Sequence, residues 1–353
     1  MKRIAEKFRL DGGAVSVKPL GEGFINDTFV VVTDKGTRYI LQRKNHNVFP
    51  DVPAMMKNIE AVTSHIKSKA KDPDRETLTV VPALDGKLYH KDEQGGFWAV
   101  CTFIEGTKTF DKAETPELAR QGGIGIGRFQ ALLSDFHTPL AETIKGFHNI
   151  RWRFTQWDEA LKCNAAGRAD GLKEEIDFVE SRRAEMLDFW KKVEDGIIPT
   201  RVTHNDTKLS NILFDSKTGK VLCAIDLDTV MSSTALNDVG DAIRSYANRT
   251  AEDDPDFSKV GIDLDMYRAY MEGYLSEMGP NLCASEKEYL AFAPLYITYE
   301  QVLRFLMDYI DGDTYYKIKY PDHNLVRTRS QIALLKSMEE NYDRMKETVA
   351  SLL

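Results

Sequence analysis

The sequence lacks several features that would place the protein in a special class. No apolar run approaches the length of about 18 residues that a transmembrane helix needs. The four cysteines, Cys101, Cys163, Cys223 and Cys283, include no pair at C-x-x-C spacing. Acidic residues outnumber basic ones, 55 to 47, which disfavours the clustered positive surface that nucleic acid binding requires. We therefore expect no membrane partner, no zinc site, no disulfide framework and no nucleic acid partner.

The opening residues also lack the apolar core and the cleavage site of a signal peptide, which together with reduced cysteines predicts a cytoplasmic protein. What the chain does contain, 42% hydrophobic and 29% charged residues, is typical of a soluble globular protein. Because 353 residues exceed what one hydrophobic core usually serves, we expect two lobes. The sequence does not indicate an oligomeric state.

The pattern of apolar residues changes near residue 106. Before it, alternating and β-branched runs predict a strand-rich lobe with one helix at 53–70. The predicted strands are 14–20, 29–34, 38–44, 78–84 and 97–104. After it, apolar residues recur at helical spacing, which predicts helices at 117–136, 175–196, 264–279, 286–312 and 329–353. A β-rich lobe of 1–106 is therefore followed by a larger, mostly helical lobe of 107–353.

Polar residues of the kinds that serve in catalysis and metal binding gather in a short strand-and-loop segment of the helical lobe. His204, Asp206 and Asn211 fall within eight positions, and Asp226 and Asp228 follow the next apolar stretch. Buried polar groups need partners, and a divalent cation with phosphate oxygens would supply them in a phosphoryl-transfer site. The alternative is a polar turn capped by Asp206 and Asn211, with Asp226 as a helix N-cap.

The segments HNDTKLSN (204–211) and IDLD (225–228) resemble the catalytic and metal motifs of the aminoglycoside phosphotransferase and choline kinase superfamily, which is similar in fold to protein kinases. With further segments, nearly the whole chain looks like the bacterial N-acetylhexosamine 1-kinases. These segments are 39–45, 59–64, 304–316 and 319–331. The resemblance implies an α+β, bilobal, protein-kinase-like fold. It also implies ATP- and Mg²⁺-dependent phosphorylation of the anomeric O1 of N-acetylglucosamine or N-acetylgalactosamine.

The same resemblance implies roles for residues of the polar segment. Asp206 would be the catalytic base and would contact the acceptor, Asn211 and Asp226 would bind Mg²⁺, and His204 would support the catalytic loop. Lys208 would stabilise the transferring phosphoryl charge, or would be a solvated surface lysine.

Two neighbours of Asp226 also fall within this scheme. Asp228 would be a further metal or water ligand, or only a helix N-cap. Thr229 beside it is assigned to the substrate site.

The nucleotide would be held by the first lobe. Gly21, Gly23, Asn26 and Thr28 would form a hairpin over the phosphates, although a G-x-G hairpin is also an ordinary turn. The third glycine of the superfamily is absent, and Asn26 stands near its position.

The phosphate-binding lysine of a kinase would fall on Gln42, with Arg43 beside it. Strand alternation places these two side chains on opposite faces, so only one of them faces the nucleotide. Glu60 matches the kinase helix glutamate or is an exposed helix residue. Backbone groups near Phe103 to Glu105 would read the adenine edge, in a segment that is equally a buried central strand.

The sugar would contact Arg304, Asp308 and Tyr316. The first two stand at i, i+4 on a helix, where a plain ion pair is the alternative, and aromatic core packing is the alternative for Tyr316.

Two other functions stay open. The same fold would serve another acceptor, such as choline, an aminoglycoside, an amino acid or another sugar, or the chain would be a non-catalytic nucleotide-binding scaffold.

Overall fold

The computed structural model describes residues 1–21 and 25–353. These residues form two compact units, each built from several stretches of the chain. Unit 1 comprises Met1–Thr109, Leu132–Lys145 and Ile212–Ser232. Unit 2 comprises Phe110–Ala131, Gly146–Asn211 and Ser233–Leu353. Within the described part of the chain, no helix is both long and apolar enough to cross a membrane.

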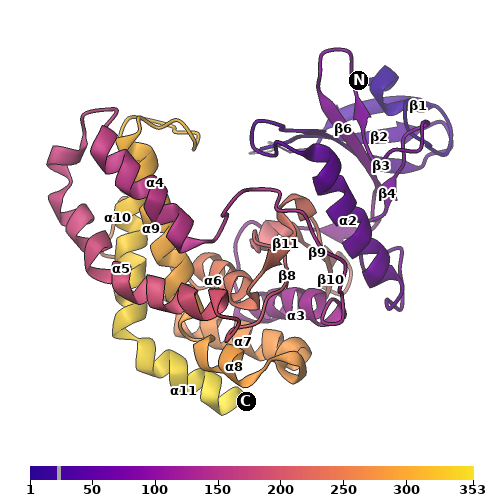
Figure 1. Cartoon of the computed structure of the whole chain (residues 1–353). Helices are drawn as coiled ribbons and strands as arrows, with labels where there is room; N and C mark the ends of the chain where they lie inside the picture. The colour runs from indigo at the N-terminus through magenta and orange to yellow at the C-terminus, as the bar shows by residue number, and fades with distance from the viewer. Residues whose placement is uncertain (22–24) are drawn as a thin grey trace. The chain divides into compact units, whose positions relative to one another are not determined.

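Unit 1 is organised around an antiparallel sheet of order β1-β2-β3-β6-β4, with β5 paired to β6 (Figure 1). Its strands alternate buried and exposed side chains, so Val31, Leu41 and Val100 lie in one apolar core. The strands are β1 (Ala14–Pro19), β2 (Asp27–Thr33), β3 (Arg38–Lys44), β4 (Val80–Val81), β5 (His90–Lys91) and β6 (Phe97–Thr102). A smaller sheet has the order β10-β9-β7, with β7 (Thr107–Lys108), β9 (Ile212–Asp215) and β10 (Val221–Ala224).

The helices of unit 1 are α1 (Lys2–Ala5) and α2 (Val52–Lys67). Helix α2 begins where Asp51 accepts the Ala54 N–H at 3.0 Å, followed by a proline in the first turn. Its Asn58 side chain donates to the carbonyls of Ala141 at 2.8 Å and Val230 at 3.0 Å. One buried amide therefore ties the two later stretches of the chain into unit 1. The short 3₁₀ turn η3 (Leu227–Thr229) also belongs to this unit.

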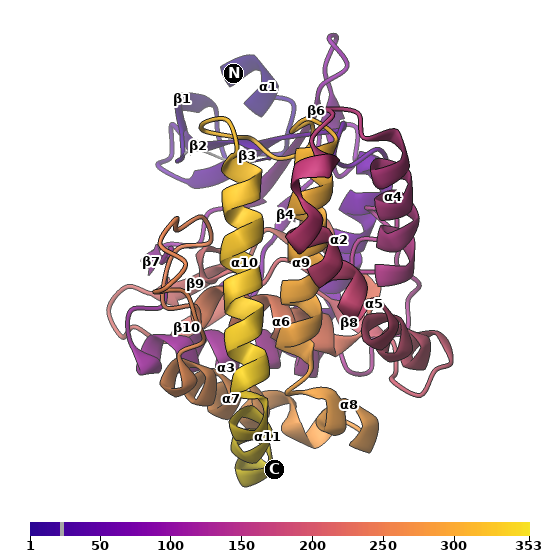
Figure 2. The ribbon, with the colours of Figure 1, turned by 90° about the vertical axis from the view of Figure 1, so that its left-hand side faces the viewer.

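Unit 2 is mostly helical. Helices α9 (Ala293–Ile310) and α10 (His323–Glu340) run side by side, and every residue of α9 except Met307 is buried (Figure 2). The other helices are α3 (Pro116–Leu132), α4 (Ile150–Cys163), α5 (Lys173–Glu194), α6 (Ala235–Tyr246), α7 (Leu264–Met278), α8 (Ala284–Tyr289) and α11 (Tyr342–Leu352). Strand β8 (Arg201–Thr203) and the 3₁₀ turns η1 (Ala169–Gly171), η2 (Leu209–Asn211) and η4 (Gly279–Asn281) also belong to unit 2. Strand β11 (Met231–Ser233) begins in unit 1, and only its last residue belongs to unit 2.

Most of the predicted elements are present, but the structure differs from the sequence-based boundaries in several places. Helix α6 was not predicted, and the expected strand 78–84 is reduced to β4 at Val80–Val81. Helix α4 was not predicted, because charged residues interrupt its apolar positions and Arg153 is one of the residues that it buries. The expected helix 286–312 divides into α8 and α9, since Pro294 lacks an N–H and starts a new helix. The expected helix 329–353 divides at Asn341 into α10 and α11.

Helices α3 and α7 approach closely at glycines. A Cβ on Gly123 would lie 2.2 Å from the Tyr270 carbonyl oxygen, and one on Gly273 would lie 2.0 Å from the Arg120 carbonyl oxygen. Neither position tolerates a side chain without displacement of backbone. This contact fixes α3, whose Gln130 donates to Asp238 of α6.

Candidate active site

The loop at 204–207 is held by a carboxylate from α6. Asp238 is fully buried and accepts the backbone N–H of His204 at 2.9 Å and of Asn205 at 2.7 Å. It also accepts the Gln130 amide at 2.7 Å. Asn205 has a φ of 66°, a left-handed conformation that is uncommon outside glycine but that asparagine adopts more readily than most residues. Its hydrogen bond to Asp238 helps to hold this conformation.

A second α6 carboxylate, one turn further on, extends the same anchor. Asp241 accepts the Thr207 N–H at 2.8 Å and pairs with Arg244 at 3.1 Å. Burial alone would raise the pKa of Asp241, but the positive charge of Arg244 contributes to holding it below its usual value. Sequence reasoning missed both residues. The available signal was a pair of acids at i, i+3 inside an otherwise buried helix.

The loop brings together four of the predicted site residues. Asp206 is 24% exposed at its side chain, and its carboxylate lies 3.0 Å from the Lys208 ammonium. The Asn211 amide group donates to the Asp206 carboxylate at 3.0 Å and to its carbonyl at 2.9 Å. His204 is buried and accepts the Asp206 N–H on its Nδ1 at 3.3 Å. The Asp206 side chain is thus oriented by Asn211 and Lys208 yet reaches solvent.

The amide orientation of Asn211 has a chemical consequence. Since its nitrogen faces Asp206, its Oδ1 points elsewhere and accepts no hydrogen bond from the described residues. An amide oxygen is the atom that a hard cation such as Mg²⁺ binds. No three His, Cys, Asp or Glu side chains cluster as a metal site in the described ranges.

In unit 1, the two acidic residues of the IDLD motif have different surroundings. Asp226 has a φ of 59° and precedes η3. Asp228 is 3% exposed, and its two carboxylate oxygens accept the Lys44 ammonium at 2.7 Å and the Asn26 amide at 2.7 Å. Thr229 is buried in the same turn. Each oxygen of Asp228 is therefore engaged by a side chain of the protein itself.

Lys44 is the residue that sequence reasoning missed on β3. It shares a face of the strand with Gln42, whose Oε1 accepts the ammonium at 2.7 Å, and Arg43 is exposed on the opposite face. Glu60 hydrogen-bonds Ser64 at 3.2 Å and forms no ion pair within the described residues. The acid that neutralises this lysine is thus Asp228. The alternation of β3 places Lys44, two residues beyond Gln42, on the same face of the strand.

The predicted phosphate hairpin is described at three of its four positions, since Gly23 lies outside the described residues. Gly21 has a φ of 66° and is exposed. The Asn26 Oδ1 accepts the Asn45 N–H at 3.1 Å, and the Thr28 hydroxyl accepts the Gln42 amide at 3.3 Å. Asn26 and Thr28 therefore tie the hairpin to β3.

The segment after β6 leaves two backbone groups unpaired. The Phe103 N–H donates to the Arg38 carbonyl at 3.3 Å, and Arg38 lies over the Phe103 ring and pairs with Glu105. Within the described part of the chain, the Phe103 carbonyl and the Glu105 N–H have no hydrogen-bond partner. They stand two residues apart, one acceptor and one donor.

The predicted sugar residues lie on α9 and in the loop after it. Asp308 does not pair with Arg304. Its carboxylate accepts the backbone N–H groups of Thr314, Tyr315 and Tyr316 at 2.8 to 3.0 Å and the Asn324 amide at 2.8 Å. Asp308 thereby fixes the loop that carries the aromatic side chains.

Arg304 is 9% exposed and lies 5.2 to 5.8 Å from the centres of the Phe147, Tyr315 and Tyr316 rings. Its guanidinium makes one hydrogen bond to described residues, 3.4 Å to Gln301, which in turn donates to the Tyr316 hydroxyl at 3.1 Å.

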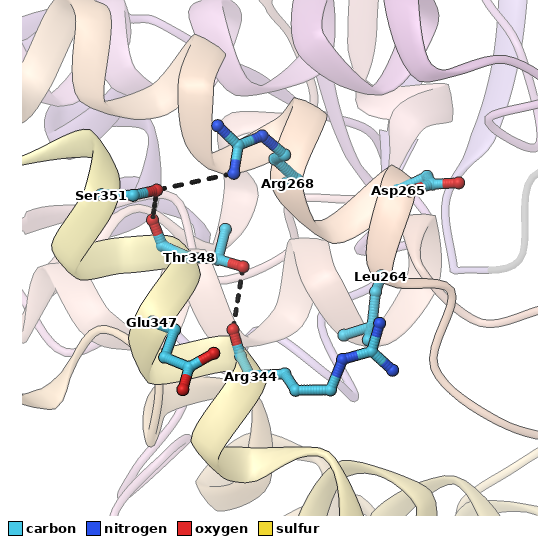
Figure 3. A pocket seen from close by; sticks show the side chains of 7 residues that line it. All are labelled: Leu264, Asp265, Arg268, Arg344, Glu347, Thr348 and Ser351. Atoms are coloured by element: carbon cyan, nitrogen blue, oxygen red, sulfur yellow. Dashed lines mark hydrogen bonds between the residues drawn. The ribbon is translucent and has the colours of Figure 1, made fainter.

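A groove elsewhere in unit 2 contains none of these residues. It lies between α7 and α11 and has a volume of about 310 Å³ (Figure 3). Its lining consists of Leu264, Asp265, Arg268, Arg344, Glu347, Thr348 and Ser351.

A sheet with a buried, acid-paired lysine and a loop that presents an aspartate beside an asparagine define a kinase-like phosphotransferase. The sequence model of the Phosphotransferase enzyme family matches residues 16–272. The chain belongs to this family and is a small-molecule kinase. The acceptor on which it acts is a separate question.

Solved structures share the whole fold. An aminoglycoside phosphotransferase from Alicyclobacillus acidocaldarius has a TM-score of 0.64 and 14% identity, covering 100% of this chain and 97% of that one. A microcompartment-associated aminopropanol kinase has a TM-score of 0.64 and 16% identity, covering 98% and 97%. The amicoumacin kinase hAmiN, in complex with AMP-PNP, Ca²⁺ and its substrate, has a TM-score of 0.60 and 14% identity, covering 96% and 92%. This likeness confirms the α+β, protein-kinase-like fold.

Proposed function

We propose that this protein transfers the γ-phosphoryl group of ATP, with Mg²⁺, to the anomeric hydroxyl of an N-acetylhexosamine. The nucleotide part is supported by the AMP-PNP and Ca²⁺ bound in the related amicoumacin kinase. It is also supported by the Phe103 carbonyl and the Glu105 N–H, for which the described residues provide no hydrogen-bond partner. Adenine offers a donor at N6 and an acceptor at N1, which match this acceptor and donor in order.

For catalysis, Asp206 would accept the proton of the attacking hydroxyl. Its two contacts, with Asn211 and Lys208, keep the carboxylate in one orientation, and orientation is the main source of rate in phosphoryl transfer. The Asn211 Oδ1 and Asp226 would hold Mg²⁺, which neutralises charge on the phosphates. Lys44 would approach the phosphates from β3. Asp228, with both oxygens taken by Lys44 and Asn26, would position that lysine.

The buried guanidinium of Arg304 is the observation that carries the choice of acceptor. It has five N–H donors and one long hydrogen bond to described residues, so it has donors left for a ligand. Arg304 lies one turn after Glu300 on α9, and Glu300 is joined through His148 to the loop of Asp206. Sugar hydroxyls and an acetamido carbonyl are neutral acceptors that suit such donors, and the nearby Tyr316 ring suits a sugar face.

Cationic acceptors fit these surroundings less well. A quaternary ammonium needs an aromatic cage free of positive charge, and an aminoglycoside needs available carboxylates. Here the aromatic rings already surround a guanidinium. The nearest carboxylates, Glu300 and Asp308, are engaged by protein donors. Choline, amino alcohols and aminoglycosides are therefore the less favoured acceptors.

Phosphorus NMR of the purified protein with MgATP tests the proposal directly. Separate tubes contain N-acetylglucosamine, N-acetylgalactosamine, choline and kanamycin. We expect a sugar 1-phosphate signal and ADP with at least one of the amino sugars. Product only in the choline or kanamycin tube would replace the proposed acceptor, and nucleotide binding without any product would favour the scaffold function.

A further inference from the structure

A buried histidine outside the predicted site touches the catalytic loop. His148 precedes α4 and is 7% exposed. Its Nε2 lies 3.2 Å from the carbonyl oxygen of Asn205, the residue before Asp206. Its Nδ1 lies 2.6 Å from the Glu300 carboxylate on α9. The Tyr296 hydroxyl, also from α9, donates to the His148 carbonyl at 2.7 Å and fixes the backbone there.

Both ring nitrogens of His148 thus face acceptors. A neutral imidazole has one N–H and one lone pair, so a neutral ring would set its lone pair against either the carboxylate or the carbonyl. Only the imidazolium donates to both. The positive charge of the imidazolium would also compensate the buried negative charge of Glu300, whose other oxygen accepts the Arg153 guanidinium at 3.2 Å.

The charged groups around the ring favour the same state. Burial lowers the pKa of His148, but the charge and hydrogen bond of Glu300 outweigh it, with help from Asp241 on α6, and Arg304 on α9 opposes them. The net direction is a pKa above the usual value. Burial by itself raises the pKa of Glu300, but the positive charges of His148, Arg153 and Arg304 bring that pKa below its usual value. The negative charges of Glu300 and Asp241 therefore outweigh the positive charge of Arg304 in their effect on the pKa of His148.

We propose that His148, as an imidazolium between Glu300 and the Asn205 carbonyl, is a positioning residue that fixes the catalytic loop from the side opposite its backbone N–H groups. Asp238 holds the Asn205 N–H, and His148 holds its C=O. Asn205, the left-handed residue that precedes and orients Asp206, is then fixed at both its backbone N–H and its backbone C=O. This inference goes beyond the proposed function, because it depends on Asp206 acting as base and not on which acceptor is bound.

The protonation of His148 links stability and turnover to pH. Because the folded-state pKa of His148 is raised, its stabilising contribution is fully present below the unfolded value of about 6.5. It is lost as the pH rises through the folded value. Loss of the proton removes one of the two hydrogen bonds and releases the Asn205 carbonyl. Turnover should therefore show an alkaline decline that follows His148.

The protonation state is measured first in the wild-type protein, without any variant. Nitrogen NMR of protein carrying ¹⁵N-labelled histidine, recorded at about pH 8 and so above the usual histidine pKa of about 6.5, reports each ring nitrogen separately. The His148 resonances are assigned through their backbone connections. The spectra are also recorded as the pH rises from the usual histidine pKa to this higher pH. We expect both nitrogens to keep a proton at the usual pKa and the ring to lose one only at higher pH. A ring that loses its second proton at or below the usual pKa would overturn the proposal.

The role in catalysis is measured from the pH dependence of kcat. The readout is turnover of MgATP with the acceptor found above, or MgATP hydrolysis alone if no acceptor is found. Glu300→Gln removes the charge that sustains the imidazolium, so the alkaline decline should move to lower pH. Glu175→Gln is the matched control, because Glu175 is a buried carboxylate of unit 2 that pairs with Arg329 at 2.7 Å. Its pH profile should equal that of the wild type.

A second variant covers the case in which Glu300→Gln fails to fold. His148→Gln should lower kcat about tenfold, the equivalent of one hydrogen bond, with the KM for ATP unchanged and the alkaline decline abolished. An unchanged alkaline decline in His148→Gln would refute the positioning role. Failure of the proposed acceptor is distinguishable, since it would leave the NMR result and the hydrolysis profile in place.

Discussion

Replacing Lys44 by methionine leaves Asp228 buried without its cation. The two side chains are 3% and 5% exposed, and their charged atoms lie 2.7 Å apart. Asp228 would keep one hydrogen bond, from Asn26, and the rest of its charge would be desolvated. Methionine has nearly the length of the lysine stem, so the packing around the stem is preserved.

The expected loss is large for a single substitution. Removal of one partner from a buried ion pair typically costs about 3–5 kcal/mol, because an uncompensated charge remains in a medium of low dielectric constant. Asp228→Asn should also destabilise the protein, since it leaves the buried Lys44 charge with neutral acceptors alone. The double variant buries no charge. We expect it to be more stable than the sum of the single effects by about 2 kcal/mol.

Urea unfolding followed by tryptophan fluorescence measures these differences, with Trp98 as the buried reporter in unit 1. Lys87→Met is the matched control, because Lys87 also pairs with an aspartate of unit 1 but at the exposed surface. Its unfolding curve should not change. If Lys44→Met unfolds at the same urea concentration as the control, or if the two single effects simply add, the buried Lys44–Asp228 pair is refuted.

Three further expectations follow from the site. Asp206→Asn should lower kcat by about 10²–10⁴ while circular dichroism shows an unchanged fold; full activity would exclude Asp206 as the base. Inosine triphosphate reverses the donor and acceptor pattern opposite Phe103 and Glu105, so its kcat/KM should be about a hundredfold below that of ATP, and equal values would contradict the adenine contact. Asp308→Ala should cost about 2–4 kcal/mol in thermal unfolding, because the loop from Thr314 loses its buried acceptor. A loss of substrate affinity with unchanged stability would instead place Asp308 in direct contact with the sugar.

Local pattern predicted the elements well where one periodicity extends over many residues. The strands around Val31 and Leu41 alternate, and the buried positions of α2 recur at helical spacing, so both were predicted. Helix α4 was not, because its apolar positions are few and only tertiary packing selects them. The joint at Asn341 likewise has no proline or glycine to mark it.

The side-chain partners could not be predicted in the same way. Strand alternation separated Gln42 from Arg43, but it gave no reason to look two residues further, where Lys44 meets an acid that is distant in sequence. The i, i+4 spacing of Arg304 and Asp308 left a sugar contact and an ion pair as alternatives. Asp308 instead accepts three backbone N–H groups of its own loop, and no helical spacing encodes that choice.

Neighbours along the chain were enough to establish the order of a β-rich and a helical part, the grouping of His204, Asp206 and Asn211 in one loop, and the kinase-like character of that loop. Periodicity and spacing record the first two features, and the resemblance of the loop to a known superfamily implied the third. Only the folded structure shows that Asp238 and His148 hold the backbone N–H and C=O of Asn205 and that Asp228 neutralises Lys44. Those pairings join residues between 33 and 184 positions apart. They form because a buried charge or peptide group must find a partner within the packed core.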